Sequence, residues 1–212
     1  MQHMDPEHAV QRLAELDLAV ELFHVALGQA AVDTHQCTGL DAPALAGIIF
    51  WSRTNRYLAE QLLPKGWLNT TRDSILRVIH PSRSHAITAI SASGNVGDLD
   101  GTVRSKNPKG SAMARLVEKN GQISLLTPDQ LLYGRELDDI PTWMLLYKRD
   151  HGTVIAELSL PVKMTGKYVN EWKERIPLHL PDLGDPGSDI DLLDDPLNGP
   201  LSPEVLVEVL AD

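Results

Sequence analysis

The chain has 212 residues, 42% of them hydrophobic and 23% charged, and its formal net charge is −10; this composition suits a folded chain with one sizeable core and excludes disorder throughout. The longest apolar run, residues 46–51, is far shorter than the roughly 20 residues that a membrane-spanning helix needs. Because there is a single cysteine, Cys37, and no charged stretch followed by an apolar run at the start, we expect a cytoplasmic protein that does not cross a membrane.

An amphipathic helix is expected at the beginning of the chain. Between residues 6 and 31, apolar side chains recur at steps of three and four, which predicts one long helix. The residues of this apolar stripe are Leu13, Leu16, Val20, Phe23, Leu27 and Ala30. Such a stripe packs into the core of its own chain or against a partner helix, so a homodimer through residues 10–30 is one alternative.

A second helix is predicted in the segment that follows. Asp41 is a suitable N-cap, Pro43 suits the first turn, and the helix should end before Pro64. The side chains expected to point inward are Leu45, Ile48, Ile49, Leu58 and Leu62.

Two hairpins are predicted further along the chain. The segments ILRVIH (75–80) and HAITAIS (85–91) flank a four-residue loop and have strand-like composition. The segments TWMLLYK (142–148) and TVIAELSL (153–160) form the clearest hairpin, which Pro161 is expected to close.

One helix is expected between the two hairpins. Asn107 as N-cap and Pro108 at the first helical position start it, and it should end near residue 120. The segment 168–178 fits an edge strand and a short helix equally well, so this alternative stays open.

The predicted fold class is α+β: a helical N-terminal third followed by a mostly antiparallel, hairpin-built sheet with one crossing helix. We expect residues 1–181 to form a single domain, with a helical part (1–66) and a sheet part (67–181). Residues 182–212 are expected to form an acidic, extended, proline-rich tail with a short terminal helix at 202–210.

The negative charge is concentrated in this tail. Residues 182–212 hold nine of the 29 acidic residues and no Lys or Arg, so residues 1–181 carry 20 acids against 19 bases. A segment that mixes acids with Leu, Val and Ile is typical of chains that fold on a partner. We expect the tail to bind a protein partner, to mask a basic site on its own chain, or to stay disordered.

One short motif resembles the active site of a known enzyme family. The stretch DLDGTV (98–103) resembles the first motif of the haloacid-dehalogenase-type phosphohydrolases. This resemblance implies a parallel sheet, with Asp98 as the nucleophile, Asp100 as the acid/base, and a Mg²⁺ ion held by both carboxylates.

The later motifs of that family have shorter matches. The resemblance implies that Thr127 is the phosphate-binding hydroxyl, that Lys163 or Lys167 is the lysine, and that Asp185 and Asp189 form the late acidic motif. Asp185 then joins the Mg²⁺ ligands. Against this alternative, the ASGNVG stretch before the motif is a poor buried strand, and the predicted hairpins favour an antiparallel sheet.

A basic cluster lies just after this motif. Between residues 102 and 119 there are five bases and one acid, in a body that is otherwise nearly neutral. The bases are Arg104, Lys106, Lys109, Arg115 and Lys119. The free backbone N–H groups at the predicted start of the helix add to the attraction for an anion. We therefore expect a phosphate-bearing ligand, above all nucleic acid, at these residues.

Two further pairs of residues have side chains of the kinds that bind metal ions or act in catalysis. Asp150 and Glu157 have the outline of a nuclease metal site, but we prefer a sheet-face carboxylate with a local partner as the interpretation of Glu157. His80 and His85 flank the first predicted hairpin and are expected to meet across it, as a surface pair or as catalytic groups.

These observations favour a non-enzymatic binding or regulatory protein that uses no cofactor. The alternatives are the Mg²⁺-dependent phosphohydrolase and a protein–protein adaptor without a ligand.

Overall fold

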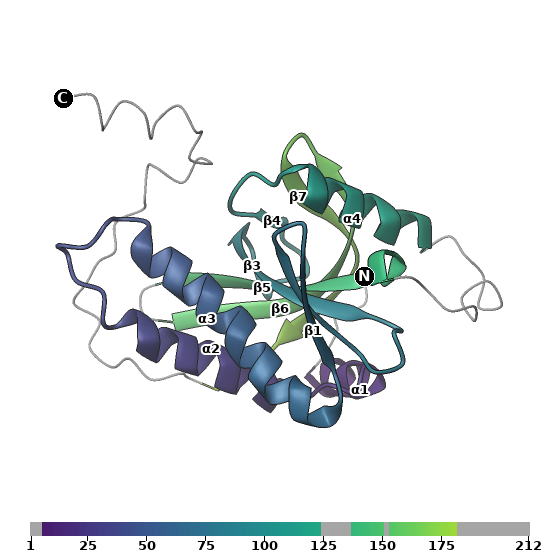
Figure 1. Ribbon diagram of the computed structural model, residues 1–212, viewed down its shortest axis with the longest axis horizontal. Coiled ribbons are helices and arrows are strands. Elements are labelled where there is room, and N and C mark those ends of the chain that lie inside the picture. Colours follow the sequence, from purple (N-terminus) through teal and green to yellow (C-terminus); the bar gives the residue numbers. More distant parts are fainter. Residues whose placement is uncertain (1–5, 124–136, 151–152, 182–212) are drawn as a thin grey trace.

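The computed structural model describes residues 6–123, 137–150 and 153–181 (Figure 1). The helices are α1 (Pro6–Glu15), α2 (Val20–Thr34), α3 (Leu45–Leu62) and α4 (Ser111–Ile123), with short 3-10 turns η1 (Leu63–Lys65) and η3 (Leu137–Asp139). The strands are β1 (Leu68–Arg72), β2 (Ile75–Ile79), β3 (Ala86–Gly94), β4 (Val103–Ser105), β5 (Thr142–Asp150), β6 (Thr153–Thr165) and β7 (Tyr168–Leu178). Within these described ranges, no helix is long and apolar enough to cross a membrane.

The strands form one mostly antiparallel sheet. The strand order is β1-β2-β3-β5-β6-β7, and β4 pairs with β3 off this path. Among the described residues, only β3 and β5 run parallel, and α4 lies in the connection between them. Three helices come before the first strand, so the predicted α+β class is confirmed.

Both predicted hairpins are confirmed. Strands β2 and β3 pair antiparallel, with Val78 opposite Ile87. Strands β5 and β6 pair antiparallel over a longer stretch, which includes Met144 opposite Ser159. The alternative left open at residues 168–178 is also decided, because this segment is strand β7 and pairs antiparallel with β6.

Pro161 does not close the second hairpin as expected. Strand β6 continues to Thr165, and the register between β6 and β7 shifts on both sides of Pro161. A bulge is the place where a sheet tolerates proline, because the missing N–H group then leaves no ladder bond unmade. Because the strand is longer, the β6–β7 turn, which contains Gly166 and Lys167, lies next to the segment that follows β4.

The prediction of one long N-terminal helix is wrong, because α1 and α2 are separate helices. The N–H group of Leu18 donates to the carbonyl of Leu13 at 3.0 Å, and Asp17 has a φ of 55°. A left-handed residue beyond the last turn is a common way for a helix to end. Leu13 and Phe23, on either side of this break, are both buried in the core of their own chain.

Helix α3 begins later than predicted. It starts at Leu45, whereas the carboxylate of Asp41 accepts a hydrogen bond from the N–H group of Thr38 at 2.8 Å and so shapes the preceding turn. Ile48, which we expected to point inward, has 53% of its surface exposed.

Helix α4 also begins later than predicted, at Ser111 rather than at residues 107–108. The N–H group of Lys109 donates to the carbonyl of Lys167 at 2.7 Å, which holds this segment against the β6–β7 turn. Lys109 therefore lies in a loop before the helix, and not within its first turn.

Helices cover both faces of the sheet. Helices α1 to α3 pack on one face, where Phe23 belongs to the same apolar cluster as Leu145 of β5. Helix α4 packs on the other face, where Val117 belongs to a cluster with Met144 and Leu146. Strand β5 thus alternates its side chains between two cores. Figure 1 shows α2 and α3 on one side of the sheet and α4 on the other.

Candidate functional site

The five predicted basic residues are distributed over strand β4, the loop that follows it and helix α4. Arg104 is on β4, and Lys106 and Lys109 are in the loop between β4 and α4. Arg115 and Lys119 are on helix α4. The sequence places all five close together along the chain, but their surroundings in the fold differ.

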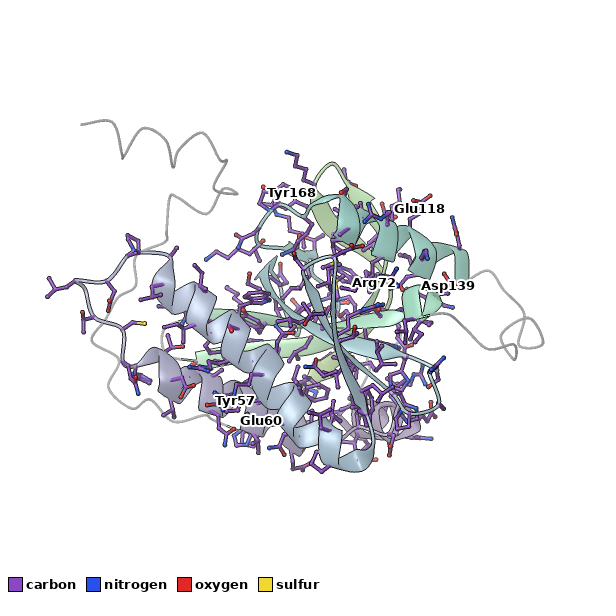
Figure 2. The ribbon with its side chains drawn as sticks, viewed as in Figure 1. Tyr57, Glu60, Arg72, Glu118, Asp139 and Tyr168 are labelled. Carbon is purple, nitrogen blue, oxygen red and sulfur yellow. The ribbon has the colours of Figure 1, made fainter. Side chains whose placement is uncertain are left out.

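The two cations on α4 are paired with carboxylates. Arg115 Nη2 lies 3.0 Å from an oxygen of Asp73, in the turn between β1 and β2. Lys119 Nζ lies 2.7 Å from an oxygen of Asp139, in η3. Figure 2 shows Asp139 and the acidic Glu118 toward the C-terminal end of α4. Nearby carboxylates therefore balance the positive charges of Arg115 and Lys119, and the exposed face of α4 attracts an anion only weakly.

The cations before α4 are joined by a lysine from a distant part of the chain. Lys167 lies in the β6–β7 turn, and its carbonyl accepts the hydrogen bond from Lys109 described above. We call Arg104, Lys106, Lys109 and Lys167 the basic cluster. Over the part of the chain that the structure describes, none of these four residues has a carboxylate within ion-pair distance.

Lys109 is the member of the basic cluster with the most unusual surroundings. Its side chain is partly buried, and burial lowers its pKa from 10.5 to about 8. A buried ammonium group without a counter-ion is destabilised relative to its neutral form. An anion bound beside Lys109 would stabilise the ammonium form and raise this pKa again.

Arg104 lies on the ring of Tyr168, the first residue of β7. The guanidinium carbon is 4.5 Å from the ring centroid, a favourable cation–π distance. Two hydrogen bonds fix β4 against β7: Ser105 Oγ accepts from the N–H group of Val169 at 3.2 Å, and Trp172 Nε1 donates to the carbonyl of Val103 at 3.0 Å. Figure 2 shows Tyr168 near the N-terminal end of α4.

The DLDG motif lies in the loop between β3 and β4. Strand β3 ends at Gly94, so Asp98 is not at the end of a strand, as the phosphohydrolase resemblance implied. Asp98 and Asp100 are both exposed, and a carboxylate oxygen of Asp98 accepts the N–H group of Asp100 at 3.0 Å. This hydrogen bond is typical of a turn formed by an Asp side chain.

The structure describes only some of the other residues that the resemblance implied. Thr127, Asp185 and Asp189 lie outside the described residues. Lys163 pairs with Glu171 at 2.8 Å. Within the described ranges, no group of three or more His, Cys, Asp or Glu side chains is arranged to hold a metal ion.

A buried ion pair lies beneath this loop. Glu157 is fully buried, and its two oxygens accept hydrogen bonds from Arg175 Nε at 2.8 Å and Nη2 at 2.7 Å. Ser159 Oγ donates to the same carboxylate at 2.7 Å, and the N–H group of Gly97 donates at 2.8 Å. Glu157 is therefore the sheet-face carboxylate with a local partner that we predicted, and all of these contacts compete with a metal ion.

The side chain of Arg175 also forms hydrogen bonds with the backbone of the loop between β3 and β4. Its guanidinium donates to the carbonyl oxygens of Asn95, Asp98 and Gly101 at 3.1, 3.0 and 2.8 Å. The loop thus wraps around a cation that is itself neutralised by Glu157. The geometry gives the motif a structural explanation, because its turns present carbonyl groups to one side chain.

The glycines of this region are required by the same geometry, and they provide a test. Gly94 has a φ of 94°, and a Cβ atom there would collide with the carbonyl oxygen of Thr102. We expect Gly94→Ala to lower the free energy of unfolding by more than about 2 kcal/mol, measured by urea denaturation.

Gly47 in α3 is the matched control for this substitution. Nothing lies within 4 Å of a Cβ atom added there. Since alanine favours a helix, Gly47→Ala should raise the free energy of unfolding by about 0.5–1 kcal/mol. Similar effects of the two substitutions would contradict the strained conformation of Gly94.

The two histidines of the first hairpin do meet. The rings of His80 and His85 are stacked with centroids 4.9 Å apart, and each lies nearly perpendicular to the ring of Trp67. Ser84 Oγ lies 2.9 Å from Nδ1 of His85, and His80 Nε2 lies 3.7 Å from a carboxylate oxygen of Asp17. Because His85 is buried, its pKa falls to about 4, so it is neutral at physiological pH.

Sequence reasoning missed Tyr168 and Arg175, and it named Lys167 only as one of two lysines that the phosphohydrolase resemblance implied. Gly166 and Lys167 separate two strand-like segments, which is a hairpin signal, but the proline within β6 obscures it. No local pattern identifies Arg175, because its partners are distant in the chain.

No family model, curated protein or solved structure matches this chain. The assignment of a function therefore depends on the geometry of its own residues.

Proposed function

We propose that this chain is a cytoplasmic, non-enzymatic protein that binds the phosphates of nucleic acid through the basic cluster. The observation that carries the proposal is the absence of carboxylate partners around Arg104, Lys106, Lys109 and Lys167 among the described residues, while the neighbouring cations on α4 are paired. Unpaired cations on one surface attract phosphate groups and release their counter-ions.

The low pKa of Lys109 supports the same proposal. Below a pH of about 8 the ammonium form predominates, and a phosphate oxygen next to it would replace the hydration that burial removes. The neighbouring Lys106 and Lys167 are exposed, so they can follow a flexible phosphate backbone. We infer that Lys109 positions one phosphate and that the exposed lysines contact its neighbours.

The acidic tail has a place in this proposal, although residues 182–212 lie outside the described structure. With nine acids and no base, the tail competes with phosphates for the basic cluster or binds a protein partner of its own. A shortened chain of residues 1–181 distinguishes the two roles, because it should bind nucleic acid more tightly than the full chain only if the tail masks the cluster.

A triple substitution tests the binding site. Lys106→Gln, Lys109→Gln and Lys167→Gln together should weaken binding to a fluorescent oligonucleotide at low salt by at least about tenfold, measured by anisotropy. Each lost phosphate contact should also reduce the slope of log affinity against log salt by about 1.

Arg115→Gln with Lys119→Gln is the matched control for this experiment. Both residues are already neutralised by carboxylates, so affinity should change less than about twofold. If the control pair reduces affinity as much as the triple substitution does, the site lies on α4 and not at the basic cluster. If neither the full chain nor residues 1–181 bind at low salt, the proposed function is wrong.

A further inference from the structure

The stack of Arg104 on Tyr168 is a flat surface within the basic cluster. Arg104 is exposed and Tyr168 is partly buried, so one face of the guanidinium lies on the ring and the side chain remains open to solvent. Arg104 has no carboxylate partner among the described residues. Planar guanidinium groups stack on nucleic-acid bases when they are free to do so.

The backbone holds this stack in place before any ligand binds. The residues on either side of Arg104 are Val103 and Ser105, and both are hydrogen-bonded to β7 through Trp172 Nε1 and the N–H group of Val169. Ser105 is also fully buried. A stacking surface that is ordered in advance loses less conformational entropy on binding.

The arrangement of charges favours a single strand over a duplex. Duplex binding commonly places a helix or a two-stranded ribbon in a groove, with cations along several phosphates. On α4, the helix next to the cluster, the cations Arg115 and Lys119 are already paired with Asp73 and Asp139. The unpaired cations lie on β4, in the loop that follows it and in the β6–β7 turn, and one of them, Arg104, stacks on an aromatic ring.

We propose that the basic cluster binds single-stranded nucleic acid, with one base stacked on the Arg104–Tyr168 pair and the adjoining phosphates on Lys106, Lys109 and Lys167. This inference rests on the nucleic-acid binding proposed above. A base in a duplex is stacked between its neighbours, so it does not reach this surface without leaving the helix.

The test compares a single-stranded DNA of about 12 nucleotides with the duplex of the same length, using the full chain and anisotropy at low salt. We expect the single strand to bind at least about tenfold more tightly. Arg104→Lys keeps the charge but removes the planar group, so it should reduce affinity for the single strand by about tenfold and leave affinity for the duplex within about twofold.

Arg83→Lys is the matched control, because it makes the same substitution at an exposed arginine in the loop between β2 and β3, and it should not reduce affinity for either probe. Tyr168→Leu should weaken single-strand binding as Arg104→Lys does, with an unchanged circular dichroism spectrum as the check on folding. Equal affinity for the two probes, or no effect of Arg104→Lys, would overturn this inference and leave the proposed function standing. Absence of binding to both probes overturns both proposals.

Discussion

Arg175→Met should lower the free energy of unfolding by about 3–5 kcal/mol, because it leaves the Glu157 carboxylate buried without its partner. Glu157 has no exposed side-chain surface and Arg175 has 12%. The same substitution removes the donors that hold the carbonyl groups of Asn95, Asp98 and Gly101. Urea denaturation at pH 7 measures the change.

Two other variants separate the charge from the loop contacts. Adding Glu157→Gln to Arg175→Met removes the buried charge, so the double variant should be more stable than Arg175→Met alone. Arg115→Gln removes one partner of an exposed pair and should change stability by less than about 1 kcal/mol. A loss of the same size for Arg115 and Arg175 would show that burial of the pair has no energetic consequence.

Acid should destabilise the protein through His85. Burial, and secondarily the charge of His80, lowers the pKa of His85 from 6.5 to about 4, while the carbonyl of Leu16 and the carboxylate of Asp17 oppose this shift. The unfolded chain therefore binds a proton first as the pH falls. The stabilisation from neutral His85 is complete above pH 6.5 and is lost as the pH falls from 6.5 to about 4. The total loss across this range is about 3 kcal/mol.

His85→Phe tests this linkage, because the phenyl ring fills a similar volume and does not titrate. Urea midpoints at pH 7 and at pH 4.5 should differ less in the variant than in the wild-type chain. His179→Gln, which replaces an exposed histidine, should leave the wild-type pH profile unchanged. A profile for His85→Phe that parallels the wild type would show that His85 does not cause the acid sensitivity.

The hairpins were predictable because their information is local. In the β2–β3 and β5–β6 pairs, two strand-like segments are separated by a short loop, and neighbouring segments of this kind pair antiparallel. The break at Asp17 was not predictable from periodicity, since Leu16 and Leu18 are both buried and continue the apolar pattern through the turn. The late start of α4 depends on a hydrogen bond from Lys109 to Lys167 that no local sequence pattern indicates.

The candidate site was only half predictable. The sequence groups Arg104, Lys106 and Lys109 because they are close along the chain, and the structure places them on β4 and in the loop that follows it. It does not indicate that Arg115 and Lys119 are compensated, since Asp73 and Asp139 reach them from other elements. The DLDG motif illustrates the opposite error, because a short run of Asp and Gly that resembles a catalytic motif also suits a tight turn.

The sequence by itself determined the α+β class, the two hairpins and the separation of a nearly neutral body from an acidic tail, because composition and residue periodicity act locally. Only the tertiary structure decided which cations are paired, that Lys167 joins the basic cluster, and that Arg175 and Glu157 support the loop between β3 and β4. These outcomes depend on distances between segments far apart in the chain. Electrostatic energy and hydrogen bonding depend on those distances, and the order of residues does not specify them.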